Sequence, residues 1–84
     1  MKIDVNYQNE TDTVEVTFHK SEFKTDQDSH LALNIVFTFA HNFDLEPEME
    51  VETIQEILSM LEEENKDKFT FGFSEEGVDV DLAK

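Results

Sequence analysis

Two pairs of short segments alternate apolar and polar residues with the period of a β-strand. The first pair, residues 3–7 and 14–18, is joined by the turn-forming stretch QNETDT, and the second pair, residues 68–73 and 78–82, is joined by SEEG. Such alternation predicts half-buried strands, and two of them joined by turn-forming residues predict a hairpin. Gly77 suits the positive φ that a tight turn requires. We therefore predict one hairpin near each end of the chain.

The large apolar side chains of both predicted hairpins fall on one face, because successive side chains of a strand point to opposite faces. This face consists of Ile3, Val5, Tyr7, Val14, Val16, Phe18, Phe69, Phe71, Phe73, Val78, Val80 and Leu82. The other face carries the carboxylates of Asp4, Glu15, Asp79 and Asp81. We interpret these carboxylates as the solvent side of a sheet rather than as a catalytic pair.

One amphipathic helix is predicted between the hairpins. Thr53, followed three residues later by Glu56, matches a capping box, and Asn65 is a suitable helix end. The stripe expected to be buried consists of Ile54, Ile57, Leu58 and Leu61. The face expected to be exposed consists of Glu52, Glu56, Ser59 and Glu63.

Residues 29–43 fit two different periods. Read as a strand, the stretch has a large apolar residue at every odd position, and IVFTF is poor in strong helix formers. Read as a helix, it has one polar stripe and an upstream DQDS that offers caps; the stripe would be His30, Asn34, Thr38 and His41. We favour a strand over 31–39, with these side chains buried: Leu31, Leu33, Ile35, Phe37 and Phe39.

The predicted fold class is α+β. It is a small antiparallel sheet of four to five strands, made of the two hairpins and a central strand, with one helix packed on its apolar face. Residues 1–84 suffice for a single acidic domain with one modest core. A hydrophobic content of 38% that includes eight Phe excludes a disordered acidic tail, which would be poor in aromatic residues.

Composition and motifs argue against catalysis. The chain has no Cys, which removes disulfides, thiolate metal sites and Cys nucleophiles. It has no nucleophile elbow and no phosphate-binding Gly loop, and His19, His30 and His41 lack metal-ligand spacing. The N-terminus has no apolar signal core, and the longest apolar run, LALNIVFTFA, is too short to span a bilayer. We expect a cytoplasmic protein that is not an enzyme and has no catalytic residue, metal or cofactor.

The charge of the chain carries the functional prediction. Twenty-one acids against six Lys, with no Arg, give a net charge of −15. Nucleic acid and anionic membranes would repel such a chain, so the expected partner is a basic protein. Residues 44–84 hold 14 acids and three Lys, whereas residues 1–43 hold seven acids and three Lys. Between Asp44 and Glu64 there are nine acids and no base.

Within this acidic run, the stretch EPEMEVE (46–52) has an acid at every second residue. We expect it to be extended, with Met49 and Val51 turned inward and the glutamates outward at intervals of about 6.6 Å. Three further glutamates, 62–64, lie at the end of the predicted helix. Negative charge at that end costs about 0.3–1 kcal/mol per residue, so these acids do not serve helix stability.

In its general character, such a rigid acidic surface resembles the small DNA-mimic inhibitors that phages make against host enzymes and defence systems. We predict a DNA-mimic inhibitor that blocks the basic groove of a nucleic-acid-binding enzyme or defence protein. The alternative is an acidic protein-interaction module of another sort, such as an immunity protein for a basic toxin or an adaptor. The predicted partner-binding residues are Glu46, Glu48, Glu50, Glu52, Glu56, Glu62, Glu63 and Glu64.

Overall fold

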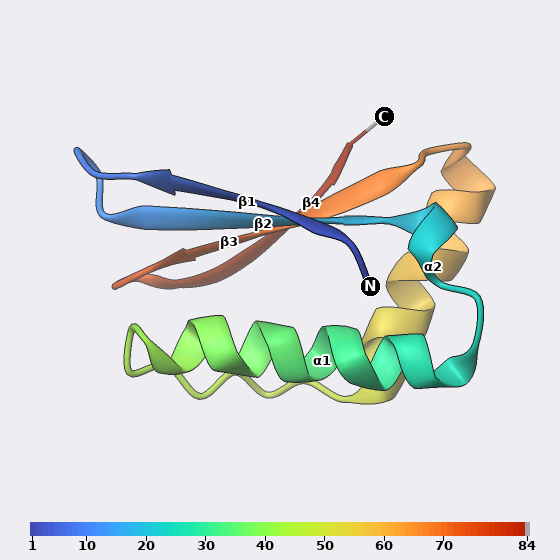
Figure 1. Ribbon diagram of the computed structural model, residues 1–84, viewed down its shortest axis with the longest axis horizontal. Helices are drawn as coiled ribbons and strands as arrows, with labels where there is room; N and C mark the ends of the chain where they lie inside the picture. Colours follow the sequence, from blue (N-terminus) through green and yellow to red (C-terminus); the bar gives the residue numbers. More distant parts are fainter. Residues whose placement is uncertain (84) are drawn as a thin grey trace.

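The fold is a four-stranded antiparallel sheet with two helices on one face (Figure 1). The structure is a computed structural model that describes residues 1–83. Its elements are β1 (Ile3–Gln8), β2 (Thr13–His19), a 3₁₀ turn (Lys20–Glu22), α1 (Asp26–His41), α2 (Val51–Glu64), β3 (Lys68–Ser74) and β4 (Gly77–Ala83). The strands lie in the order β1-β2-β3-β4, and every neighbouring pair is antiparallel. The predicted α+β class and both hairpins are confirmed.

The strand register places the apolar side chains on one face, as predicted. Val16 of β2 lies opposite Val5 and Phe71, and Phe71 in turn lies opposite Val80. The two central strands supply most of the core because both helices pack beneath them. The edge strands are less well covered, and Val5 and Tyr7 of β1 remain 51% and 54% exposed. The open face of the sheet holds polar residues. Two of them, Thr17 and Thr70, form a hydrogen bond of 2.8 Å between their hydroxyl groups.

The predicted strand over residues 31–39 is wrong, because these residues belong to α1. The buried residues of α1 recur with the spacing of a helix: Ser29, Ala32, Val36 and Ala40. Leu31 and Phe37, which a strand would bury, are 42% and 36% exposed. The weak helix propensity of IVFTF is overridden by packing, since most helical stability in proteins comes from burying one face.

A capping box fixes the start of α1. Thr25 is the N-cap residue, and the Asp28 carboxylate accepts hydrogen bonds from the backbone N–H groups of Lys24 (2.8 Å) and Thr25 (2.9 Å). These hydrogen bonds lower the pKa of Asp28 below its ordinary value, because they favour the ionised carboxylate. The N-cap residue thus precedes the DQDS stretch, which contributes Asp28 as the third helical residue of the capping box.

The predicted start of α2 is also wrong, although the helix itself is present. Glu50 is the N-cap, and its backbone N–H donates to Thr53 Oγ1 at 3.3 Å, so the capping pair is Glu50 and Thr53. Val51 is consequently the first helical residue rather than part of the extended stretch. The predicted buried stripe holds, with Leu58 only half-buried. Asn65 ends the helix in the left-handed conformation (φ 56°, ψ 45°), which Asn tolerates better than most residues.

Candidate partner-binding surface

The segment between the helices carries the first three predicted contact residues. From Leu45 to Glu50 the chain forms neither helix nor strand and runs back past α1 toward the start of α2 (Figure 1). The Met49 N–H donates to the Pro47 carbonyl oxygen at 3.1 Å, which makes a tight turn at Glu48, so the segment is not fully extended as predicted. Burial alternates along it: Leu45 and Met49 pack against the core, whereas the side chains of Glu46, Glu48 and Glu50 are exposed. The core contacts hold the segment in place, so its glutamates form a fixed outward row as predicted.

The outer face of α2 continues this acidic surface. Glu52, Glu56 and Glu63 are exposed and fall on one side of the helix together with Ser59. Residues four apart on a helix rise by about 6 Å, which is close to the spacing of about 6.6 Å that a fully extended chain would give. A shallow hollow of about 500 Å³ runs beside this row, with Met60 at its edge. The segment and this face of α2 thus present six glutamates without an ion-pair partner among the described residues: Glu46, Glu48, Glu50, Glu52, Glu56 and Glu63.

Two predicted contact residues are neutralised within the molecule. Glu62 Oε2 lies 2.6 Å from Lys20 Nζ, and Glu64 Oε1 lies 3.1 Å from Lys66 Nζ. The hydrogen bond from Lys20, with its positive charge, lowers the pKa of Glu62 below its ordinary value. Sequence reasoning placed all three glutamates of 62–64 alike, but only Glu63 lacks an ion-pair partner in the described part of the chain. A basic partner would have to displace a lysine to use the other two.

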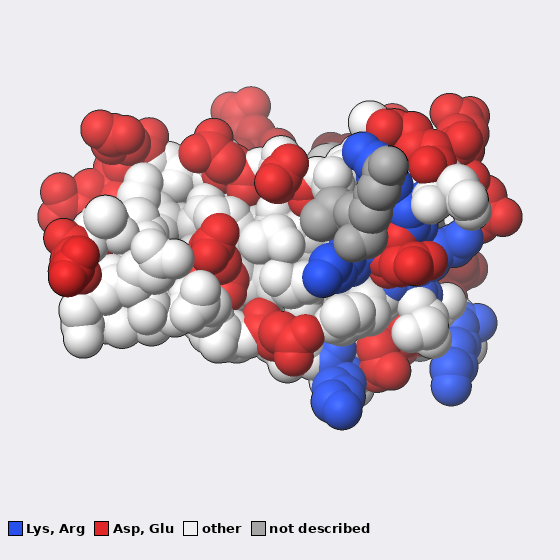
Figure 2. All heavy atoms as spheres, turned by 90° about the horizontal axis from the view of Figure 1, so that it is seen from above, with Lys and Arg blue, Asp and Glu red and all other residues white. Residues whose placement is uncertain are grey.

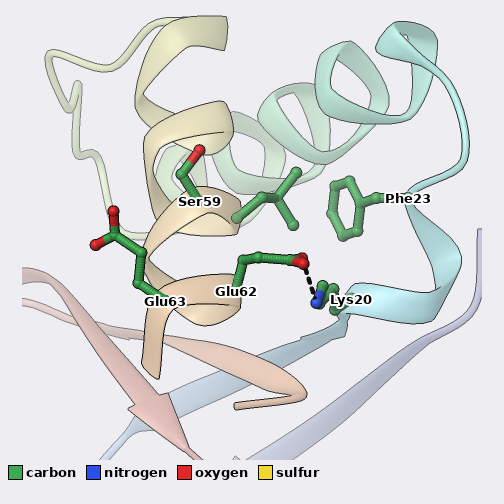
Figure 3. A pocket seen from close by; sticks show the side chains of 6 residues that line it. Lys20, Phe23, Ser59, Glu62 and Glu63 are labelled. Atoms are coloured by element: carbon green, nitrogen blue, oxygen red, sulfur yellow. Dashed lines mark ion pairs between the residues drawn. The ribbon is translucent and has the colours of Figure 1, made fainter. Parts of the chain in front are cut away.

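The ion pair of Lys20 and Glu62 forms one wall of a hollow of about 460 Å³ (Figure 3). Phe23 and Leu58 supply its apolar lining, and Ser59 and Glu63 lie on the side toward the outer face of α2. In Figure 3 the carboxylate of Glu63 points away from Lys20. The acidic row of α2 therefore stands beside an apolar depression, although its own carboxylates face solvent.

The lysines of the described residues gather at one end of the molecule. Lys2 precedes β1, Lys20 and Lys24 follow β2, and Lys66 and Lys68 lie at the start of β3. In an antiparallel sheet these positions share one end, and Figure 2 shows the basic side chains confined to that end of the sheet's open face. In the same view acidic side chains lie at both ends of this face, some of them beside the lysines, with uncharged surface between them.

Sequence reasoning missed a second acidic group at the end opposite the lysines. The first hairpin turn supplies Glu10 and Asp12, the second supplies Glu75 and Glu76, and the chain leaving α1 supplies Asp44. All five are exposed. The signal was available, because two adjacent hairpins of one antiparallel sheet place their turns at the same end, but the acids are separated by more than 60 residues in the sequence.

The open face of the sheet carries the four carboxylates predicted there. Glu15 and Asp79 lie on either side of Gly72, and Asp81 lies opposite Thr70. The fourth, Asp4, lies 2.6 Å from His19 Nε2, and this hydrogen bond lowers the pKa of Asp4. Glu15 and Asp79 both line a small hollow of about 200 Å³ on this face, whereas Asp4 and Asp81 lie outside it.

Metal-ligating residues are not grouped in the structure: among the described residues, no set of three or more His, Asp or Glu is placed to hold an ion. Neither described helix has the length and apolar character needed to cross a membrane. Comparison with protein-family models, with curated proteins and with solved structures finds no match to this chain.

Proposed function

We propose that this protein is a non-catalytic DNA-mimic inhibitor that occupies the basic groove of a nucleic-acid-binding enzyme or defence protein in the cytoplasm. The observation that carries the proposal is the run from Asp44 to Glu64, which has no base in its sequence and whose nine acids are all exposed; seven of them have no ion-pair partner among the described residues. Apolar residues of the same run pack against the core, which positions the backbone that carries these negative charges. Fixed charges complementary to a groove steer association and favour the correct orientation.

The dimensions of the molecule are compatible with this role. Its longest extent is 33 Å, close to one turn of B-DNA at about 34 Å. Carboxylates spaced by about 6–7 Å give roughly half the linear charge density of one DNA strand, whose charges are about 3.4 Å apart along the axis. The surface therefore offers a groove fewer charges per unit length than DNA does.

The experiment compares two variants that lose the same charge from different surfaces. In the first, Glu46, Glu48, Glu50 and Glu52 are all replaced by Gln; in the second, the four open-face acids are replaced by their amides. Partners retained from a lysate at moderate salt are identified, and binding of the purified partner is then measured. We expect the first variant to associate markedly more slowly and the second to bind nearly as the parent does. Gln at position 50 keeps a side-chain acceptor for the helix start, so circular dichroism should show an intact fold.

Competition with nucleic acid separates this proposal from the alternative of an adaptor or immunity protein. A DNA mimic must be displaced by DNA or RNA from the same groove, and its binding must weaken steeply as salt increases. If nucleic acid and this protein bind the partner simultaneously, the mimic proposal is wrong. If the four-Gln variant binds at full strength, the acids of residues 46–52 serve only to keep the protein hydrated.

A further inference from the structure

The end of the sheet that holds both hairpin turns contains a hollow with aromatic walls. It has a volume of about 560 Å³ and lies between β1, the middle of the sheet and the end of α1. Tyr7 of β1 contributes a ring that is more than half exposed, and Phe39 and Phe43 contribute rings that are half-buried. Phe39 also stacks on the core residue Phe73, with 5.8 Å between the ring centroids, which fixes this side of the hollow.

The rim of the same hollow is acidic. Asp12 comes from the first hairpin turn, Glu75 from the second, and Asp44 from the chain that leaves α1. The hydroxyl of Tyr7 donates to Asp12 Oδ1 at 3.0 Å, which ties the exposed ring to the rim. No base lines the hollow, and the described lysines lie at the far end of the sheet. Its charge is therefore not neutralised from within the described chain.

Aromatic faces together with unpaired carboxylates form the environment that suits a guanidinium group. Arginine stacks its planar, weakly hydrated head on aromatic rings and pairs with carboxylates through two parallel hydrogen bonds. Lysine has a compact, strongly hydrated head and gains less from the rings. An anionic ligand would meet three carboxylates at the rim. The hollow is also wide enough for the aliphatic stem of a long side chain to enter beside the rings.

We propose that this hollow anchors an arginine side chain of the basic partner. The inference rests on the proposed function only in assuming a basic partner. Of the residues that line the hollow, only Asp44 belongs to the acidic run of residues 44–64. Arginine is enriched among the residues that contribute most to binding energy at protein interfaces. The hairpin end would then fix the register of the complex, while the glutamates of the segment 46–50 and of α2 supply diffuse attraction.

The test is a titration of the full-length, ¹⁵N-labelled protein with the peptide acetyl-Gly-Gly-Arg-Gly-Gly-amide, followed by NMR. Two matched peptides replace Arg by Lys or by citrulline, which has the shape of arginine without its charge. We expect saturable shift changes centred on Tyr7, Phe39 and Phe43 with the Arg peptide, weaker binding of the Lys peptide and none of the citrulline peptide. Equal binding of the Arg and Lys peptides, or shifts spread over the whole acidic surface, would overturn the proposal.

Variants keep the test specific to the hollow. Removing two rim charges with Asp44→Asn and Glu75→Gln should weaken binding of the Arg peptide about three- to tenfold, since each exposed ion pair contributes only modestly. The control pair Glu52→Gln and Glu56→Gln removes the same charge from α2 and should leave affinity within about twofold. Tyr7→Thr, which changes no charge and suits a strand, should weaken binding several-fold. If both charge pairs weaken the peptide equally, the hollow contains no site.

The outcome is distinguishable from failure of the proposed function. Suppose that the peptide does not bind in the hollow, while the four-Gln variant binds the partner weakly and DNA competes with the parent protein for that partner. The arginine site is then wrong and the DNA-mimic proposal stands. If the peptide binds in the hollow while nucleic acid does not compete for the partner, the arginine site stands and the partner is recognised outside a nucleic-acid groove.

Discussion

Replacing Gly72 by Thr should stabilise the protein, because nothing in the structure requires glycine at this position. Gly72 lies in the middle of β3, opposite Glu15 on one side and Asp79 on the other. Its backbone is outside the left-handed region, and a Cβ added there would have no heavy atom within 4 Å. Glycine inside a strand costs roughly 0.5–1 kcal/mol relative to Ala, and β-branched residues occupy the favourable end of a propensity range of about 1 kcal/mol. The expected gain is therefore about 1 kcal/mol.

The gain is measured by urea unfolding followed by circular dichroism, together with a thermal melt. For a domain of this size, 1 kcal/mol corresponds to an increase in Tm of about 4–8 °C. Gly72→Ala should give a smaller gain, because it restricts the unfolded chain without adding a β-branched side chain. Thr70→Gly is the converse control on the same face, and it also removes the hydrogen bond to Thr17.

A Gly72→Thr protein no more stable than the parent would refute this reasoning. It would mean that β3 is not regularly paired at residue 72 or that another group approaches its open face closely. The variant keeps every charge, so partner binding through the acidic segment and α2 should be unchanged. If the stabilised variant loses its partner, the open face of the sheet belongs to the interface.

Three further outcomes are expected. Salt should raise the Tm between low ionic strength and a few tenths molar, because ions screen the mutual repulsion of a surface with a net charge of −15; a flat or falling curve in a thermal melt would contradict this. Asn65→Ala should cost about 1 kcal/mol in urea unfolding, because Ala is strained in the left-handed conformation that Asn65 adopts, whereas Asn65→Gly should cost nothing. The lowered pKa of Asp28 means that its ionised form stabilises the fold above about pH 3.9, the unfolded value, and that this contribution is lost as pH falls through the lower folded value. Asp28→Asn should therefore be less stable than the parent at pH 7, and the difference between their urea midpoints should close in acid; a difference independent of pH would show that the charge of Asp28 is not what stabilises the start of α1.

The sequence alone determined both hairpins, the existence of α2 and the acidic run. Alternation of period two has a single interpretation when turn-forming residues bound it, as they do around Gly77. The outward row of Glu46, Glu48 and Glu50 was also predictable, because the apolar residues between them must turn to the core. The start of α2 was misplaced by three residues. Thr53 was predicted as the N-cap residue with Glu56 as its partner, whereas in the structure Thr53 is itself the partner of the N-cap residue Glu50.

Only the tertiary structure decided whether residues 31–39 form a strand or a helix, because apolar residues at these positions satisfy both periods. The sheet formed by the hairpins presents a face that two helices must cover, and the small residues Ala32 and Ala40 let α1 approach it closely. Tertiary structure also separated Glu62 from Glu63, because Lys20, which is distant in sequence, reaches Glu62. Glu64 instead pairs with Lys66, only two residues away. Finally, antiparallel pairing joined Asp12 and Glu75 across the hairpin end, which no local pattern could indicate since 62 residues lie between them.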